Sequence, residues 1–116
     1  MESLGSFISD RRKKLGLSLR KLALNSKISV TYLSDIENDR SANISKEILE
    51  NLSNALMLDN RDKEKLFTLV GKRNDTIPID VEEFVKNHPD VIAYLREVKR
   101  GEHDNWLREI KKDGKT

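Results

Sequence analysis

The segment between Arg12 and Arg40 constrains the fold most, because it holds two short helical patterns separated by about three residues. Ser18 precedes the first pattern and Ser29 the second. A serine hydroxyl in this place accepts a hydrogen bond from a free N–H of the first helical turn. The segment therefore predicts two short helices joined by a tight turn. Their inward residues are expected to be Leu22 and Ala23 in the first, and Leu33 and Ile36 in the second.

The neighbouring sequence extends this pattern and predicts an all-α domain of five helices, since no segment shows the alternation typical of a strand. The first helix stops at Gly16, Ser45 caps the fourth, and Asp59 opens a fifth that Gly71 ends. The expected inward residues are Leu4, Phe7, Ile8 and Leu15 in the first helix, Ile48, Leu49, Leu52, Ala55 and Leu56 in the fourth, and Leu66, Phe67 and Val70 in the fifth.

Residues 72–79 interrupt the helical pattern and are the best candidate for a domain boundary. Their sequence, KRNDTIPI, is largely polar and contains Pro78. We therefore expect a domain over residues 1–71, a linker over 72–79 and a helical extension over 80–116. A domain this small buries a modest core, so helix packing or dimerisation must supply stability.

Further helices are predicted in the extension. Asp80 and Glu83 have the spacing of a capping box, and Pro89 suits the first position of a helix that Gly101 ends. A last short helix would carry Trp106, Leu107 and Ile110. The apolar set is large for so short a segment, so part of it must pack on the first domain, a sister chain or a partner. This set is Phe84, Val85, Val91, Ile92, Leu95, Val98, Trp106 and Leu107.

The composition excludes several classes of function. The chain has no Cys, which removes disulfides, thiolate zinc sites and cysteine nucleophiles. His88 and His103 belong to no ligand pattern, and neither a glycine-rich phosphate loop nor a serine nucleophile motif occurs. We therefore expect no metal, no cofactor and no enzymatic activity. Because we find neither a signal peptide nor an apolar run of roughly 20 residues, we expect a cytoplasmic protein without a membrane span.

Net charge by itself indicates no nucleic-acid partner. The formal charge is only +2, although 36% of the residues are charged, whereas a strongly basic domain is the usual footprint of nucleic-acid binding. The small excess of positive charge lies in the N-terminal half, where four consecutive cations form what we call a knot. A solvated helix end explains such a knot equally well, since the helix dipole favours cations there. The knot consists of Arg11, Arg12, Lys13 and Lys14.

The order of short motifs is more specific. With the helix expected after Ser45, these motifs resemble the Cro/CI-type helix-turn-helix family, also called the XRE family, over residues 4–56. The resemblance implies a five-helix, lambda-repressor-like DNA-binding domain with a short C-terminal helical extension. Its third helix, about residues 29–38, would lie in the major groove. The motifs are Leu15-Gly16-Leu17-Ser18, Leu22-Ala23, Ile28-Ser29, Tyr32-Leu33-Ser34 and Ile36-Glu37-Asn38.

The resemblance also implies which residues would meet base edges. These are the outward side chains of the third helix: Val30, Thr31, Ser34 and Asp35. Thr31 offers a hydroxyl and a methyl group, and Val30 offers apolar contact alone. Asp35 would repel phosphates but could accept a hydrogen bond from a cytosine amino group. The alternative for each is a plain exposed helix residue.

A second set is expected to bind the phosphate backbone. Ser18 and the free N–H groups opening the second helix suit a phosphate. Asn38 and Arg40 hold positions that usually contact phosphate in the family. Arg20 and Lys46 are additional candidates on the same surface, although solvation is the simpler interpretation of Lys46.

Arg12 and Glu37 occupy positions that pair across the first and third helices in the family, where such a pair would fix the angle of the third helix. Three residues depart from the usual pattern. Leu19 replaces a Gln that commonly contacts phosphate, and Lys27 replaces a Gly with positive φ, where a Cβ costs about 1 kcal/mol. Asp39 replaces another Gly and would add a negative charge near the DNA backbone. These departures bear on DNA affinity rather than on the fold.

The predicted function is a sequence-specific transcriptional regulator, a repressor in the leading interpretation. Its partner would be double-stranded DNA with a palindromic operator, read by a homodimer whose recognition helices stand about 34 Å apart. The extension over 80–116 would dimerise or bind a second protein. The alternative is an antitoxin or anti-repressor that uses the fold as a protein-interaction module, which Asp35 and Asp39 favour slightly.

Overall fold

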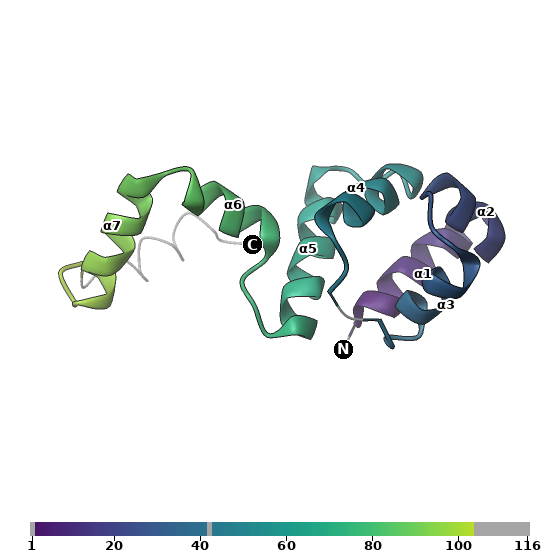
Figure 1. Cartoon of the computed structure of the whole chain (residues 1–116), viewed down its shortest axis with the longest axis horizontal. Coiled ribbons are helices and arrows are strands. Elements are labelled where there is room, and N and C mark those ends of the chain that lie inside the picture. Colours follow the sequence, from purple (N-terminus) through teal and green to yellow (C-terminus); the bar gives the residue numbers. More distant parts are fainter. Residues whose placement is uncertain (1, 42, 104–116) are drawn as a thin grey trace. The chain divides into compact units, whose positions relative to one another are not determined.

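The computed structural model describes residues 2–41 and 43–103, and every regular element in them is an α-helix (Figure 1). The all-α prediction is confirmed. None of these helices has the length and apolarity needed to cross a bilayer. The described residues form seven helices: α1 (Leu4–Lys14), α2 (Leu19–Asn25), α3 (Val30–Glu37), α4 (Lys46–Ala55), α5 (Asn60–Asn74), α6 (Ile79–Lys86) and α7 (Pro89–Lys99).

The predicted helix starts in the first half are confirmed. The side chains of Ser18, Ser29, Ser45 and Asp59 each accept a hydrogen bond from a backbone N–H three residues further on. Each bond satisfies one donor that the helix start leaves free. Ser3 does the same for α1 within a capping box that the sequence analysis did not predict. The four short polar side chains therefore set the positions of α2 to α5.

The first five helices close around one core. Their main contacts form a ring in which α1 packs on α3, α3 on α2, α2 on α4, α4 on α5, and α5 on α1. Figure 1 shows α1 beside α3, with α4 and α5 along the other side of the core. Most of the predicted inward residues are buried there. The buried apolar residues are Leu4, Phe7, Ile8, Leu22, Ala23, Leu33, Ile36, Ile44, Leu49, Leu52, Leu56, Leu66, Phe67 and Val70.

The prediction that Leu15 belongs to the core is wrong. It is 38% exposed, although the sequence placed it on the inward face of the first helix. The reason is that α1 ends at Lys14 and Leu15 is its C-cap, so helical spacing no longer sets the direction of the side chain. Gly16 follows with φ of 70°, a left-handed conformation typical of a helix end.

The prediction that Gly71 ends the fifth helix is also wrong, because α5 continues to Asn74. The helix ends at Asp75, which is left-handed, and the chain then turns back so that Thr76 N–H donates to the Gly71 carbonyl at 2.8 Å. A Cβ on Gly71 would lie 2.8 Å from the Thr76 carbonyl oxygen and 3.2 Å from Pro78 N. Glycine is therefore needed for close backbone approach, and the segment between α5 and α6 is shorter than the predicted 72–79.

The chain divides into two compact units, Met1–Asp80 and Val81–Thr116. Helix α6 begins at Ile79, which packs against the core of the first unit. Asp80 therefore lies inside the first turn of α6 and is not its N-cap, contrary to the prediction. Pro89 is the first residue of α7, as predicted, and Gly101 follows the helix with φ of 85°. The predicted last helix with Trp106, Leu107 and Ile110 lies outside the described residues.

We expect Gly71→Ala to lower the free energy of unfolding by about 1–3 kcal/mol, because the added methyl group overlaps backbone atoms that cannot move independently. In an unobstructed helix the same change would raise stability by roughly 0.5–1 kcal/mol. Urea denaturation followed by circular dichroism measures the sign. A stabilised variant would contradict the close backbone approach at this position.

Candidate nucleic-acid interface

Helices α2 and α3 form the predicted two-helix unit, and the turn between them is tight. Lys27 has φ of 61°, the left-handed conformation expected at the position where the family usually has Gly. Lys27 N–H donates to the Leu24 carbonyl, and Ile28 N–H to the Ala23 carbonyl at 3.1 Å. The turn is therefore closed by backbone hydrogen bonds, which offset the cost of a Cβ in this conformation.

Helix α3, the predicted recognition helix, has a buried side and an outward side. Leu33 and Ile36 are fully buried and hold α3 against α1 and α2. Val30 is 39% exposed, Thr31 is exposed as well, and Ser34 and Asp35 are half-buried. All four predicted base-contact residues thus reach the surface. Because Ser29 caps the first turn, the positive end of the helix dipole lies beside Val30 and Thr31.

The residues predicted to bind phosphate differ in their surroundings. Ser18 is exposed at the start of α2, and its hydroxyl accepts from Lys21 N–H at 3.0 Å. Arg20 is exposed in the same first turn. Lys46 is half-buried at the first position of α4. Asn38 and Arg40 lie in the loop after α3, where both make hydrogen bonds back to the recognition helix.

Those hydrogen bonds join four of the predicted DNA-contacting residues in two pairs. The Asn38 side-chain amide donates to the Ser34 carbonyl at 2.8 Å and lies 3.4 Å from its hydroxyl. Arg40 donates from Nη2 and Nε to Asp35 Oδ1 at 3.1 and 3.3 Å. Neither pair was predicted from the sequence. The spacing of four residues between Ser34 and Asn38 was an available signal, since side chains meet at that distance on a helix. The spacing of five between Asp35 and Arg40 gave none.

Asp39 was predicted from the sequence to place a negative charge close to the DNA backbone. Its carboxylate accepts from Gly5 N–H at 2.9 Å, at the N-terminal end of α1, and from Arg73 Nη1 at 3.3 Å. Its φ is 57°, the left-handed conformation that explains why the family usually has Gly here. The charge is thus engaged by the α1 dipole and by Arg73, so Asp39 ties the loop after α3 to α1 and α5.

Gly5 allows α1 to approach the end of the recognition helix. It is buried, and a Cβ there would overlap the Glu37 carbonyl group and lie 2.9 Å from Asp39 Oδ1. The sequence analysis did not single out Gly5. Its one signal was a glycine inside the first turn of an amphipathic helix, a place where glycine costs stability unless two backbones come close.

Arg12 and Glu37 lie together, with Arg12 Nε donating to Glu37 Oε2 at 2.7 Å and Nη2 to Oε1 at 3.0 Å. Nη1 also donates to the Leu17 carbonyl at 3.0 Å. The side chains of Arg12 and Glu37 are only 14% and 8% exposed. The hydrogen bond to Glu37 raises the pKa of Arg12 above its ordinary value. This bidentate pair joins α1 to the last residue of α3.

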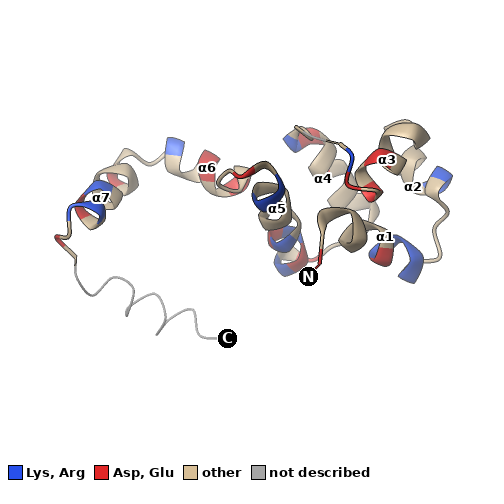
Figure 2. Ribbon diagram, turned by 90° about the horizontal axis from the view of Figure 1, so that it is seen from below, with Lys and Arg blue, Asp and Glu red and all other residues tan. Residues whose placement is uncertain are grey.

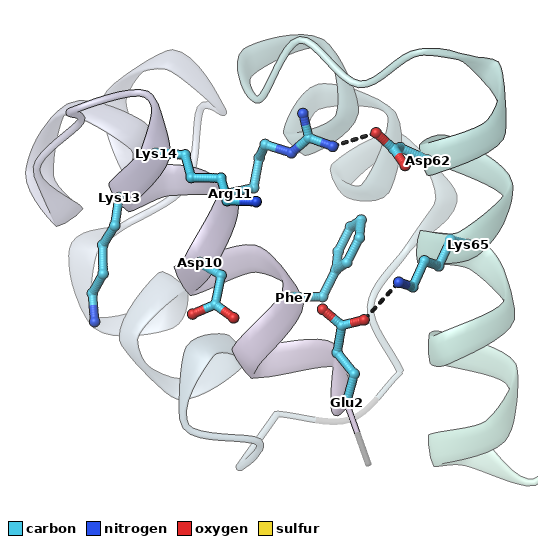
Figure 3. Close-up of a pocket in the computed structure, with 8 residues that line it drawn as sticks. All are labelled: Glu2, Phe7, Asp10, Arg11, Lys13, Lys14, Asp62 and Lys65. Carbon is cyan, nitrogen blue, oxygen red and sulfur yellow. Dashed lines mark hydrogen bonds and ion pairs between the residues drawn. The ribbon is translucent and has the colours of Figure 1, made fainter.

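The knot of four cations at the end of α1 is divided between two sides of the helix. Arg11 forms an ion pair with Asp62 of α5, and Lys65 forms one with Glu2 over the ring of Phe7 (Figure 3). Arg12 pairs with Glu37 instead. Arg11 and Arg12, two of the four cations of the knot, therefore hold helices together. For these two residues this favours a structural role over a contact with nucleic acid.

Charge is mixed over the rest of the described structure as well. Figure 2 shows basic and acidic residues interspersed on α5 and α7. The described residues include no cluster of three or more His, Asp or Glu side chains that could hold a metal ion. With a formal charge of only +2, the protein has little long-range attraction for a polyanion such as DNA.

The two-helix unit, its capped recognition helix and the surrounding helices define a DNA-binding domain of the helix-turn-helix class. Residues 8–57 match the model of the helix-turn-helix family. The match supports a domain of the Cro/CI, or XRE, type over these residues. The match spans α1 from Ile8 through α4 and includes the whole predicted interface. A search of curated proteins found no similar sequence.

We expect Glu37→Ala to lower the free energy of unfolding by about 3 kcal/mol, because it leaves the Arg12 guanidinium largely buried without its carboxylate. Thermal denaturation measures the loss. Glu2→Ala is the matched control, since it removes the exposed ion pair with Lys65 and should cost less than about 1 kcal/mol. Equal melting temperatures for the two variants would contradict a stabilising role for the Arg12–Glu37 pair.

Proposed function

We propose that this protein is a sequence-specific repressor that inserts α3 into the major groove of an operator. The observation that carries the proposal is the orientation of α3. Its inner side is fully buried, whereas its capped N-terminal end presents Val30 and Thr31 to solvent. A helix held in this way is the usual reader of base edges in this class of domain. Occupation of an operator would exclude other proteins from the same DNA.

The proposed base contacts follow from the chemistry of the exposed side chains. Val30 and the Thr31 methyl group suit a thymine methyl, and the Thr31 and Ser34 hydroxyls can donate or accept. Asp35 suits a cytosine amino group once its carboxylate is released from Arg40. The phosphate contacts would come from the residues around α3 and at the starts of α2 and α4. These are Ser18, Arg20, Asn38, Arg40 and Lys46.

Base and phosphate contacts are separable by mutation. We expect Thr31→Ala to change the preferred operator sequence, with a loss of about 1–3 kcal/mol at the position that Thr31 reads. Arg40→Ala should weaken binding to operator and random duplex alike and reduce the dependence of log K on log salt by about 0.9. Operators selected from random DNA, followed by titrations at several salt concentrations, test both. A uniform loss from Thr31→Ala would contradict base reading by α3.

We further propose that the protein acts as a homodimer on a palindromic operator, with α6 and α7 contributing to the interface. Among the described residues these two helices bury no side chain completely. Four large apolar residues are exposed there: Val81, Phe84, Tyr94 and Leu95, between 42% and 54%. Exposed apolar surface of this kind is typical of a protein–protein interface. A dimer would also supply the second recognition helix that a palindrome needs.

Leu95→Glu is expected to weaken the dimer at least about tenfold, because it places a charge in an apolar interface. Sedimentation equilibrium measures the dissociation constant. Met57→Glu is the matched control, because Met57 is 75% exposed and lies at the turn between α4 and α5. If both variants dimerised as tightly as the wild type, the interface would lie elsewhere.

The second candidate is an antitoxin or anti-repressor whose helix-turn-helix domain serves mainly to bind a protein. It is favoured by Asp35 and by the hydrogen bonds that engage Asn38 and Arg40 within the chain. Salt-dependent binding to the protein's own promoter fragment separates the candidates, because only a DNA-binding regulator shows the counterion effect. In either role we propose a cytoplasmic protein that binds rather than catalyses and needs no cofactor.

A further inference from the structure

Asp35 and Arg40 are joined through both side chain and backbone. The guanidinium donates to Asp35 Oδ1 at 3.1 and 3.3 Å, and Arg40 N–H donates to the Asp35 carbonyl at 2.8 Å. The backbone bond keeps the two residues adjacent, whereas the side-chain pair is open to solvent, with Arg40 62% and Asp35 40% exposed. An exposed ion pair of this kind contributes little stability and opens readily.

We propose that Asp35 is a specificity-determining residue because it competes with DNA phosphate for Arg40. This inference rests on the proposed function and gives it a mechanism of discrimination. In the free protein the carboxylate holds the guanidinium, and we name this contact the Asp35–Arg40 latch. Arg40 offers its full charge to a phosphate only when it leaves Asp35, so the carboxylate and a phosphate compete for the guanidinium.

The cost of opening the latch depends on the DNA sequence. Beside random DNA the released carboxylate faces phosphates and the two acceptors that each base-pair edge presents, and it meets an amino group only where the sequence happens to place one within reach. Beside a suitably placed cytosine it accepts a hydrogen bond from the amino group. The latch therefore weakens binding to random DNA more than binding to the operator. Discrimination of this kind rests on a repulsive element acting against the wrong partner.

Neighbouring cations do not take over the carboxylate. Arg12 is bonded to Glu37 and Arg73 to Asp39, and the Asn38 amide is bonded to Ser34. In the described part of the chain, the Asp35 carboxylate accepts two hydrogen bonds from Arg40. Removing the Asp35 charge should thus release Arg40 alone and leave the rest of the loop in place.

The test compares the full-length wild type with Asp35→Asn on a selected operator and on random duplex, over a range of salt. Asp35→Asn should bind random duplex about 3- to 10-fold more tightly than the wild type does, and its gain in affinity for the operator should be smaller. The ratio of operator affinity to random-duplex affinity should therefore fall. Its log K against log salt should be steeper by up to about 0.9, since one more phosphate is neutralised without exposing a carboxylate.

Two further variants separate local competition from a general change of charge. Glu2→Gln removes the same charge from the ion pair with Lys65 and should gain much less on random duplex. In an Arg40→Gln background, Asp35→Asn should gain less on random duplex than it does in the wild-type background, because no guanidinium is released. Suppose that the wild type binds DNA and that Asp35→Asn gains no more affinity for random duplex than Glu2→Gln does. The latch would then be wrong, and the proposed function would stand. A wild type that bound no duplex would overturn both.

Discussion

The bidentate pair between Arg12 and Glu37 is the interaction on which the position of α3, the proposed recognition helix, depends. It joins α1 to the last residue of α3, with nitrogen–oxygen distances of 2.7 and 3.0 Å, and both side chains are almost fully enclosed. Gly5 permits the same two helices to touch through their backbones, and Asp39 ties the following loop to the start of α1. Because these contacts meet at the C-terminal end of α3, its N-terminal end is free to enter a groove.

The interface around α3 is largely satisfied within the chain before any partner arrives. Asn38 bonds to Ser34 and Arg40 to Asp35, and two cations of the basic knot bind neighbouring helices. With a formal charge of only +2, the protein has little general attraction for DNA. Under the proposed function, affinity would depend on exchanging these internal hydrogen bonds for contacts with DNA, and a DNA sequence that offers a partner to every released group would be favoured.

The helix starts and the core of the first unit could be predicted from sequence because both are local properties. A capping side chain acts on its own first turn, and apolar spacing marks the buried side of a helix. The errors arose where tertiary contacts decide. Gly71 lies inside α5 because a returning segment needs its space, and Leu15 is exposed because the helix ends before it. Hydrogen bonds across the end of α3, such as Asp35 with Arg40, and the engagement of Asp39 by α1 also require three-dimensional proximity.

Recognition of DNA by α3 is tested by backbone amide chemical shifts, recorded by nuclear magnetic resonance while a duplex selected from random DNA is added. We expect the largest shift changes at the starts of α2 and α3, along the outward side of α3 and in the loop after it, at residues 18–21, 29–35 and 38–40. Changes confined to α6 and α7, or to the α1–α5 side around Phe7 and Asp62, would contradict DNA recognition by α3.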